Sequence, residues 1–145
     1  MLRSIGSKED LERPTGVAVN AEGDRIYVID RSYNENTNQR VVVYNAEGKK
    51  LFTIGERGIK EGQFNVPVQG AVGPDGTLYV LDAGNFRVQA FDRDGKFLRA
   101  WGKVGNNIGD FARPRGIAVD NEGNVYVTDA TFANVQLFNS QGQLL

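Results

Sequence analysis

The sequence predicts an all-β fold built from repeated four-stranded antiparallel sheets. Three observations predict it: a pattern of about 47 residues occurs three times, each copy contains short β-branched and aromatic segments, and turns rich in Gly, Asn and Asp separate these segments. Such segments are typical of strands, and such turns supply the positive φ angle that tight hairpins need. No stretch has the sustained 3.6-residue period of an amphipathic helix, so we expect no helix longer than a turn.

The first predicted strand of each copy makes the repeat visible. RPRGIAV at 113–119 matches RPTGVAV at 13–19, and VPVQGAV at 66–72 is a weaker copy. A leucine opens the fourth predicted strand, and 47 residues separate Leu51 from Leu98. Four strands in about 47 residues is the size of one blade of a β-propeller. We therefore expect a β-propeller of four-stranded antiparallel blades, with three blades in the chain.

The second and third predicted strands carry aromatic residues at fixed positions. The second strand reads IYVID, LYVLD and VYVTD in the three copies, and the third reads VVVY, VQAF and VQLF. Because the tyrosines share one register of the strand, we expect them to pack between blades. These residues are Tyr27, Tyr79 and Tyr126.

These motifs resemble the NHL repeat. The resemblance rests on PRGIAVD at 114–120, GNVYVTD at 123–129, NFRVQAF at 85–91 and FLRAWG at 97–102, and it covers nearly the whole chain. It implies a propeller that closes with six blades. It implies little about function, because propellers are scaffolds on which many functions occur.

Two positions depart from the repeat. Gln69 stands where the other copies have glycine, which predicts a slight distortion of the first strand in the second copy. The third copy has Phe132 and Asn134 where the second has Asn85 and Arg87, so the Asn-x-Arg signature is missing there.

The repeat divides one domain into segments. We expect residues 1–6 to form the outer strand of a closing blade, 7–55 the first repeat, 56–102 the second, and 103–145 the third without most of its outer strand. Because both ends fall at the same point of the repeat, we expect a homodimer in which two chains close a six-bladed ring. Each chain would lend its first strand to the last blade of the other. The alternative is that the chain is a piece of a longer six-repeat polypeptide.

The composition excludes several kinds of site. The chain has no His and no Cys, which excludes His-based triads, His-ligated metals, thiolate sites and disulfides. Related propellers include a zinc lyase, which needs His ligands, and calcium-dependent lactonases, which need acidic residues near the channel mouth. The corresponding positions here are Thr15, Val68 and Arg115. We therefore expect no catalytic residue, no metal and no cofactor.

The charge and hydropathy bear on partners and compartment. Net charge is −1. The loops expected to share one end of the propeller, where we expect a partner to bind, hold nine Lys or Arg against ten Asp or Glu; these loops are 6–14, 30–40, 55–67, 82–87, 102–114 and 129–134. This balance argues against RNA binding, a function known among NHL proteins and retained as the alternative, although Arg113 and Arg115 could form a local patch. No window is apolar enough to span a membrane, so we expect no membrane association; the compartment stays open.

Candidate site residues fall into two groups. Asp30, Asp82 and Asp129 recur in all copies, so we expect them to cap the turns that follow by accepting backbone N–H bonds, with Arg40 and Arg87 as their partners or as rim residues. Residues that break the repeat on the loop face are free to bind a ligand, and we expect a protein or peptide there. They are Tyr33, Asn34, Asn36, Arg57, Lys60, Arg113, Arg115 and Phe132.

Overall fold

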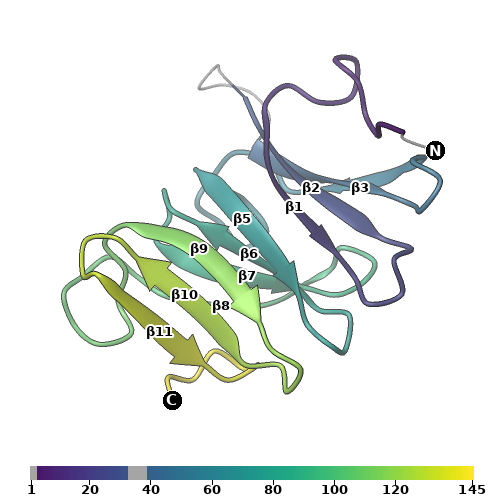
Figure 1. Ribbon diagram of the computed structural model, residues 1–145. Helices are drawn as coiled ribbons and strands as arrows, with labels where there is room; N and C mark the ends of the chain where they lie inside the picture. The colour runs from purple at the N-terminus through teal and green to yellow at the C-terminus, as the bar shows by residue number, and fades with distance from the viewer. Residues whose placement is uncertain (1–2, 33–38) are drawn as a thin grey trace.

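The computed structural model describes residues 3–32 and 39–145, and in these residues the chain forms three antiparallel β-sheets (Figure 1). The first sheet contains β1 (Pro14–Val19), β2 (Ile26–Arg31), β3 (Gln39–Tyr44) and β4 (Lys50–Ile54). The second contains β5 (Pro67–Val72), β6 (Leu78–Asp82), β7 (Arg87–Phe91) and β8 (Phe97–Trp101). The third contains β9 (Pro114–Val119), β10 (Val125–Asp129) and β11 (Asn134–Phe138). Among the described residues there is no helix, as the sequence predicts.

Within each sheet the strands lie in chain order, so hairpins build every sheet. The first strands β1, β5 and β9 lie next to one another along the inner side of the molecule (Figure 1). The sheets stack face to face as neighbouring blades do.

Apolar residues between adjacent sheets form the core. Tyr27, Ile29 and Val41 of the first sheet are fully buried against Leu78 and Val80 of the second. The next layer joins the second and third sheets in the same way, through Tyr79, Leu81, Val88, Val125 and Val127. Tyr27 and Tyr79 thus pack between sheets as predicted, whereas Tyr126 lies on the open face of the third sheet, where its hydroxyl donates to Asp120 at 3.0 Å.

The predicted distortion at Gln69 is not specific to the second sheet. The register shifts between Pro14 and Gly16 in the first sheet and between Pro67 and Gln69 in the second, and the third sheet has the same irregularity. The Gln69 side chain lies over Gly16 of the first sheet, where a Cβ atom would come within 2.7 Å of its Oε1. Gln69 thus fills the space that the neighbouring glycine leaves.

The third sheet lacks a fourth strand among the described residues. Only a short bridge from Phe138 to Leu144, and a hydrogen bond of 2.9 Å from the Leu145 N–H to the Leu137 carbonyl, follow β11. The outer edge of β11 is therefore open.

Residues 3–6 are not a strand, but they lie where the outer strand of a preceding sheet would lie. Ile5 contacts Gly48, the turn glycine of the first sheet. The same contact joins outer-strand residues to turn glycines farther along the chain: Ile54 to Gly95 and Trp101 to Gly142. The sequence predicts a strand at 1–6. Residues 3–6 would need a partner strand to form one, and the described residues do not supply it.

Candidate functional site

We define the loop end as the loops at 7–13, 55–66, 83–86, 102–113 and 130–133 together with the strand ends that adjoin them, which include Asp30, Arg31, Asp82, Arg115 and Asp129. These loops lie where the first strand of each sheet begins and the second strand ends. The loop before each sheet is called its leading loop below. All described site residues predicted from the sequence lie at this end of the molecule or at its margin.

Asp82 joins two loops of the second sheet. Its carboxylate accepts hydrogen bonds from the N–H groups of Asn65 and Val66 at 2.8 Å, and from Gly84 and Asn85 at 3.0 and 3.1 Å. The first pair belongs to the leading loop and the second to the following turn. A fully buried carboxylate is thus satisfied by four backbone donors.

Asp129 repeats this arrangement in the third sheet. It accepts bonds from Ala112 and Arg113 in the leading loop and from Thr131 and Phe132 in the following turn. Burial opposes ionisation, but these four hydrogen bonds outweigh it and lower the pKa of Asp129. The carboxylate is held ionised as a structural acceptor.

Asp30 of the first sheet has a guanidinium partner as well. It accepts bonds from the N–H groups of Glu12 and Arg13, and Arg40 forms a salt bridge to it at 3.0 Å. Arg40 also donates to the Asp10 carbonyl at 2.7 Å. The bonds to the leading loop are a feature of these aspartates that sequence reasoning missed, since residues 17 positions apart gave no signal of contact.

Arg87 holds the leading loop of the second sheet rather than a carboxylate. Its guanidinium donates to the carbonyls of Ile59 (3.1 Å), Lys60 (2.7 Å) and Gln63 (2.9 Å). The Asn85 amide donates to the Gly58 carbonyl at 2.9 Å. The Asn-x-Arg signature therefore closes the loop by satisfying its carbonyl groups.

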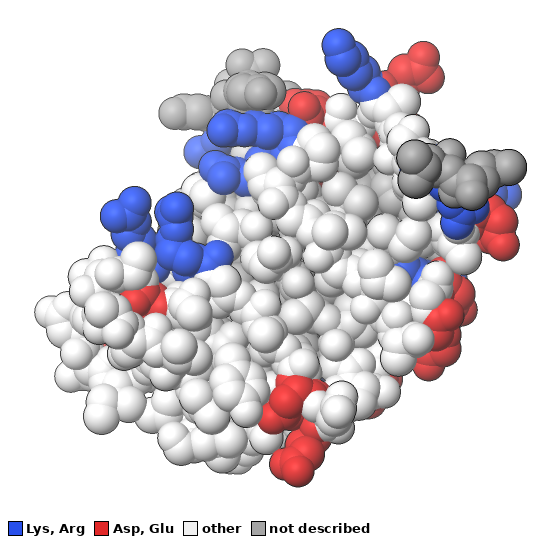
Figure 2. Space-filling model, in the orientation of Figure 1, with Lys and Arg blue, Asp and Glu red and all other residues white. Residues whose placement is uncertain are grey.

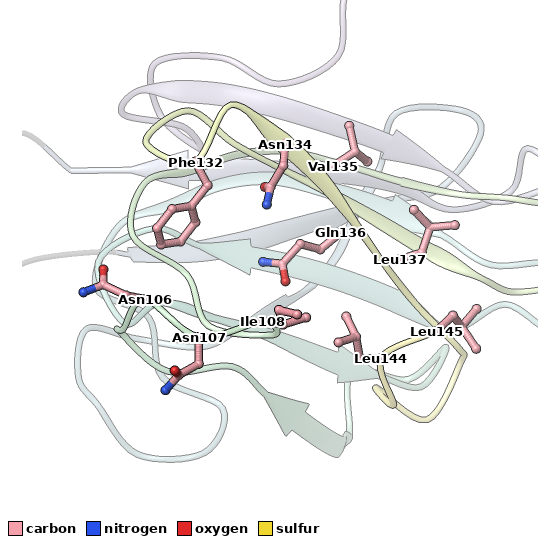
Figure 3. Close-up of a pocket in the computed structure, with 10 residues that line it drawn as sticks. All are labelled: Asn106, Asn107, Ile108, Phe132, Asn134, Val135, Gln136, Leu137, Leu144 and Leu145. Atoms are coloured by element: carbon pink, nitrogen blue, oxygen red, sulfur yellow. The ribbon is translucent and has the colours of Figure 1, made fainter.

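The third sheet keeps only part of this arrangement. Gln136, like Gln89 in the second sheet, accepts a bond from a loop glycine and donates to a loop carbonyl. Phe132 and Asn134 replace the Asn-x-Arg pair, and a pocket of about 440 Å³ lies beside them. Figure 3 shows Phe132, Asn134 and Gln136 projecting toward the loop at 106–108.

Comparison with known families identifies the repeat. The NHL repeat matches residues 11–44 and 111–137, which cover the first three strands of the first sheet and most of the third sheet. These two segments are NHL repeats. The second sheet lies between them. No curated protein matches the chain in sequence.

Solved structures share the propeller-like fold of the NHL segments. Hydrazine synthase of Kuenenia stuttgartiensis is 20% identical with a TM-score of 0.70, over 100% of this chain and 38% of that one. A gluconolactonase of Xanthomonas campestris is 24% identical with a TM-score of 0.66, over 94% and 46%. A nidogen/laminin complex is 20% identical with a TM-score of 0.65, over 90% and 45%. The chain thus spans less than half of each, and these likenesses concern the fold alone.

The structure distributes the predicted binding residues over the loop end rather than in one cluster. Arg113 and Phe132 come together, because their N–H groups both bond to Asp129. Arg57 and Lys60 lie in the leading loop of the second sheet. Arg115 is exposed in β9, and the remaining predicted residues, Tyr33, Asn34 and Asn36, lie outside the described part of the chain.

Burial changes the charge balance that the sequence suggests for this end. Four carboxylates counted there are buried: Asp30, Asp82, Asp110 and Asp129. In Figure 2 blue atoms gather along the upper edge above the starts of β5 and β9, whereas red atoms lie mainly along the lower and right edges. The accessible surface of the loop end is more basic than the residue count indicates.

Arg31 is a basic residue of the loop end that sequence reasoning missed. It ends β2, at a position where the other copies have alanine. Burial lowers the pKa of Arg31, the nearby Arg13 lowers it further, and Asp82 opposes both.

Metal-binding clusters and membrane spans are two other kinds of feature that the chain could carry. Within residues 3–32 and 39–145, no three acidic side chains converge as a group that could hold a metal ion. The same residues contain no helix long and apolar enough to cross a membrane.

Proposed function

We propose that the chain is a non-catalytic propeller scaffold that binds a protein or peptide at its loop end. One observation supports this most: the recurring polar side chains there are bonded to the chain's own backbone, whereas several residues that do not recur are exposed. Asp82 and Asp129 each bond to four backbone N–H groups, and Arg87 to three carbonyls. Arg115 and Asn134, which differ from the residues at the same positions in the other copies, are exposed.

The absence of catalysis is part of this proposal. A general acid or base needs a titratable group that faces the substrate. The three recurring aspartates are nearly inaccessible and hydrogen-bonded, so none is available to abstract a proton from a bound molecule. We propose neither a metal nor a cofactor for this surface.

We further propose that two copies assemble into a six-bladed ring. The free face of the third sheet presents Tyr126, Thr128, Val135 and Leu137, and the aligned residues of the second sheet are buried against the third. The outward face of the first sheet carries the partly exposed Leu11, Ile26 and Val28 at positions whose counterparts in the second sheet are buried against the first. A second copy would cover both faces through the contact already used twice within the chain.

The open edge of β11 fits the same assembly. In the second sheet, Val88 pairs with Trp101 and Ala90 with Arg99. In the same register, Ile5 and Arg3 of a second copy would pair with Val135 and Leu137. A segment added there would extend the third sheet to four strands.

RNA is the second candidate partner. It is favoured by the basic surface of the loop end, where Arg13, Arg31, Arg113 and Arg115 lie at the starts or ends of strands. Against it stands the scarcity of exposed aromatic rings for base stacking among the described residues of this end.

The proposal is tested with selected ligands and one triple variant. Peptides are selected from a random library against the native protein, and their affinity for Tyr33→Ala/Arg115→Ala/Phe132→Ala is measured by fluorescence polarisation, with single-stranded RNA as the competing probe. We expect at least about tenfold weaker peptide binding and an unchanged urea midpoint. Unchanged peptide affinity, or tight binding of RNA alone, would overturn the proposal. So would turnover of ester, lactone or phosphate-ester reporters that copurifies with the protein.

A further inference from the structure

We propose that the pocket of the third sheet receives an arginine side chain from the bound partner. This inference rests on the proposed binding function and names the chemistry of one contact. The pocket lies between the leading loop at 106–108 and β11, and it has a volume of about 440 Å³. Phe132 and Asn134 line it, together with Val135 and Leu137, which a second copy would cover in the proposed ring, so the arginine is assigned to the part of the pocket beside Phe132, Asn134 and the loop (Figure 3).

The pocket lies where the second sheet holds its own arginine. Asn134 pairs with Asp129 in the same register in which Arg87 pairs with Asp82. Phe132 likewise corresponds to Asn85, and the intervening residues Phe86 and Ala133 share a positive φ of 55° and 52°. The two turns therefore have the same backbone, and the third sheet lacks the long cationic side chain that leaves this turn in the second.

The two leading loops also share their backbone hydrogen bonds. In the second sheet Gly58 donates to the Phe64 carbonyl and Gln63 to the Lys60 carbonyl. In the third, the corresponding bonds run from Gly105 to Phe111 and from Asp110 to Asn107, at 3.2 and 3.0 Å. The carbonyl groups that hold Arg87 in the second sheet thus have counterparts in a loop with the same hydrogen-bonding pattern in the third.

Two of those counterparts, the Asn106 and Asn107 carbonyls, lack a side-chain donor from the described part of the chain, whereas the Asp110 carbonyl accepts the Gln136 amide at 2.9 Å, as the Gln63 carbonyl accepts that of Gln89. Within residues 3–32 and 39–145, no hydrogen bond reaches the carbonyls of Gly105 or Asn106, whereas Gly58 and Ile59 accept bonds from Asn85 and Arg87. The Asn107 carbonyl accepts only the N–H of Asp110 among the described residues. Carbonyl groups placed to accept several donors from one side are a site for a planar guanidinium, which presents five N–H groups.

The charge and shape of the site favour the same group. The third leading loop has the buried Asp110 where the second has the neutral Gln63, which places one carboxylate beside these carbonyl groups; elsewhere in the loop Lys103 and Ile108 replace Glu56 and Glu61. The Phe132 ring at the pocket offers a face for a guanidinium or for the methylene groups that carry it. A lysine ammonium would satisfy fewer of these carbonyls.

The test uses n-propylguanidinium as the probe and its neutral isostere n-propylurea as the control. Amide ¹H–¹⁵N shifts are followed in the full chain during titration with each. We expect saturable shifts at Asn106, Asn107 and Phe132 with the guanidinium and none with the urea. Absence of a saturable shift, or equal shifts with the urea, would overturn the proposal.

Two variants make the assignment specific. Asn134→Arg places an arginine at the position it has in the second sheet, so it should fill the pocket and weaken probe binding about tenfold or more. Gln141→Arg adds the same charge to an exposed turn of the same sheet and should leave probe binding unchanged. Binding that survives Asn134→Arg would show that the probe lies elsewhere. Because the probe is a small molecule, its failure to bind leaves the peptide-selection result standing, and the two proposals are judged separately.

Discussion

At the loop end, residues that recur in every repeat differ in role from residues that occur in one repeat. Asp82 and Asp129 have the same four kinds of backbone donor, and each joins a leading loop to a turn. Arg31 and Arg115, by contrast, have no counterpart of the same type in the other copies. A residue required by every sheet recurs, whereas a residue that contacts a partner is free to differ.

The first prediction concerns pH and Asp129. Because its pKa is lowered in the folded state, the carboxylate contributes stability that is present above its unfolded pKa of about 4 and is lost as pH falls through the folded value. An amide in its place does not titrate and cannot contribute this dependence. We therefore expect Asp129→Asn to flatten the fall in the free energy of unfolding between about pH 5 and pH 2, measured by urea denaturation. An identical slope in the native protein and the variant would contradict this account.

At the scale of elements, each sheet is tied to the next by its turns. The glycine that ends the turn between the third and fourth strands has a positive φ and contacts an outer-strand residue of the preceding sheet. Gly142, with a φ of 84°, faces Trp101 in this way. Side-chain size at this turn therefore controls how closely two sheets pack.

The second prediction compares two glycines with the same backbone requirement. A Cβ at position 142 would lie 2.4 Å from Cε3 of Trp101, whereas a Cβ at Gly109, with a φ of 93°, meets nothing within 4 Å. Gly109→Ala should cost about 1 kcal/mol from backbone strain alone. Gly142→Ala should cost roughly 1–3 kcal/mol more, because it also separates the sheets. Equal losses in thermal unfolding would show that the contact with Trp101 is not restrictive.

The third prediction concerns the loop that Arg87 holds. Arg87→Ala leaves three carbonyl groups without their charged donor, so we expect a loss of about 1–3 kcal/mol and faster amide exchange at residues 58–63. Lys96→Ala, an exposed cation in the same sheet, is the matched control and should change neither. Unchanged exchange in the Arg87 variant would mean that the loop holds its shape without the guanidinium.

At the scale of the whole molecule, the two free sheet faces decide how the chain exists in solution. Val88 is fully buried by the third sheet, whereas its counterpart Val135 is 53% exposed in the single chain. A face of this kind is an aggregation hazard unless another sheet covers it. The ring proposed above removes the hazard at both ends.

The fourth prediction tests that ring by light scattering. We expect twice the mass of one chain for the native protein and a monomer for Val135→Asp, because a buried unpaired charge would oppose the contact. Leu98→Asp changes a leucine that is 42% exposed on the outer strand of the second sheet and should leave the dimer intact. Deleting residues 1–6 should also prevent closure. A monodisperse native monomer would contradict the assembly.

The sequence by itself determined the all-β class, the three repeats and the turn positions. These follow from local chemistry: β-branched segments, glycines that adopt positive φ, and aspartates that recur. It also located the departure at Phe132 and Asn134, since a broken repeat is visible without coordinates.

Only the tertiary structure decided what those residues contact. The bonds from the Asn65 N–H to Asp82 and from Arg87 to the Ile59 carbonyl join loops that hairpins separate in sequence but bring together in space. Burial of Asp30, Asp82, Asp110 and Asp129 likewise depends on sheet packing, so a count of charges could not show that the loop end is basic. The meaning of the pocket beside Asn134 depends on comparing the third sheet with the second. The third sheet lacks the side chain that corresponds to Arg87 but keeps the loop and the turn that surround it.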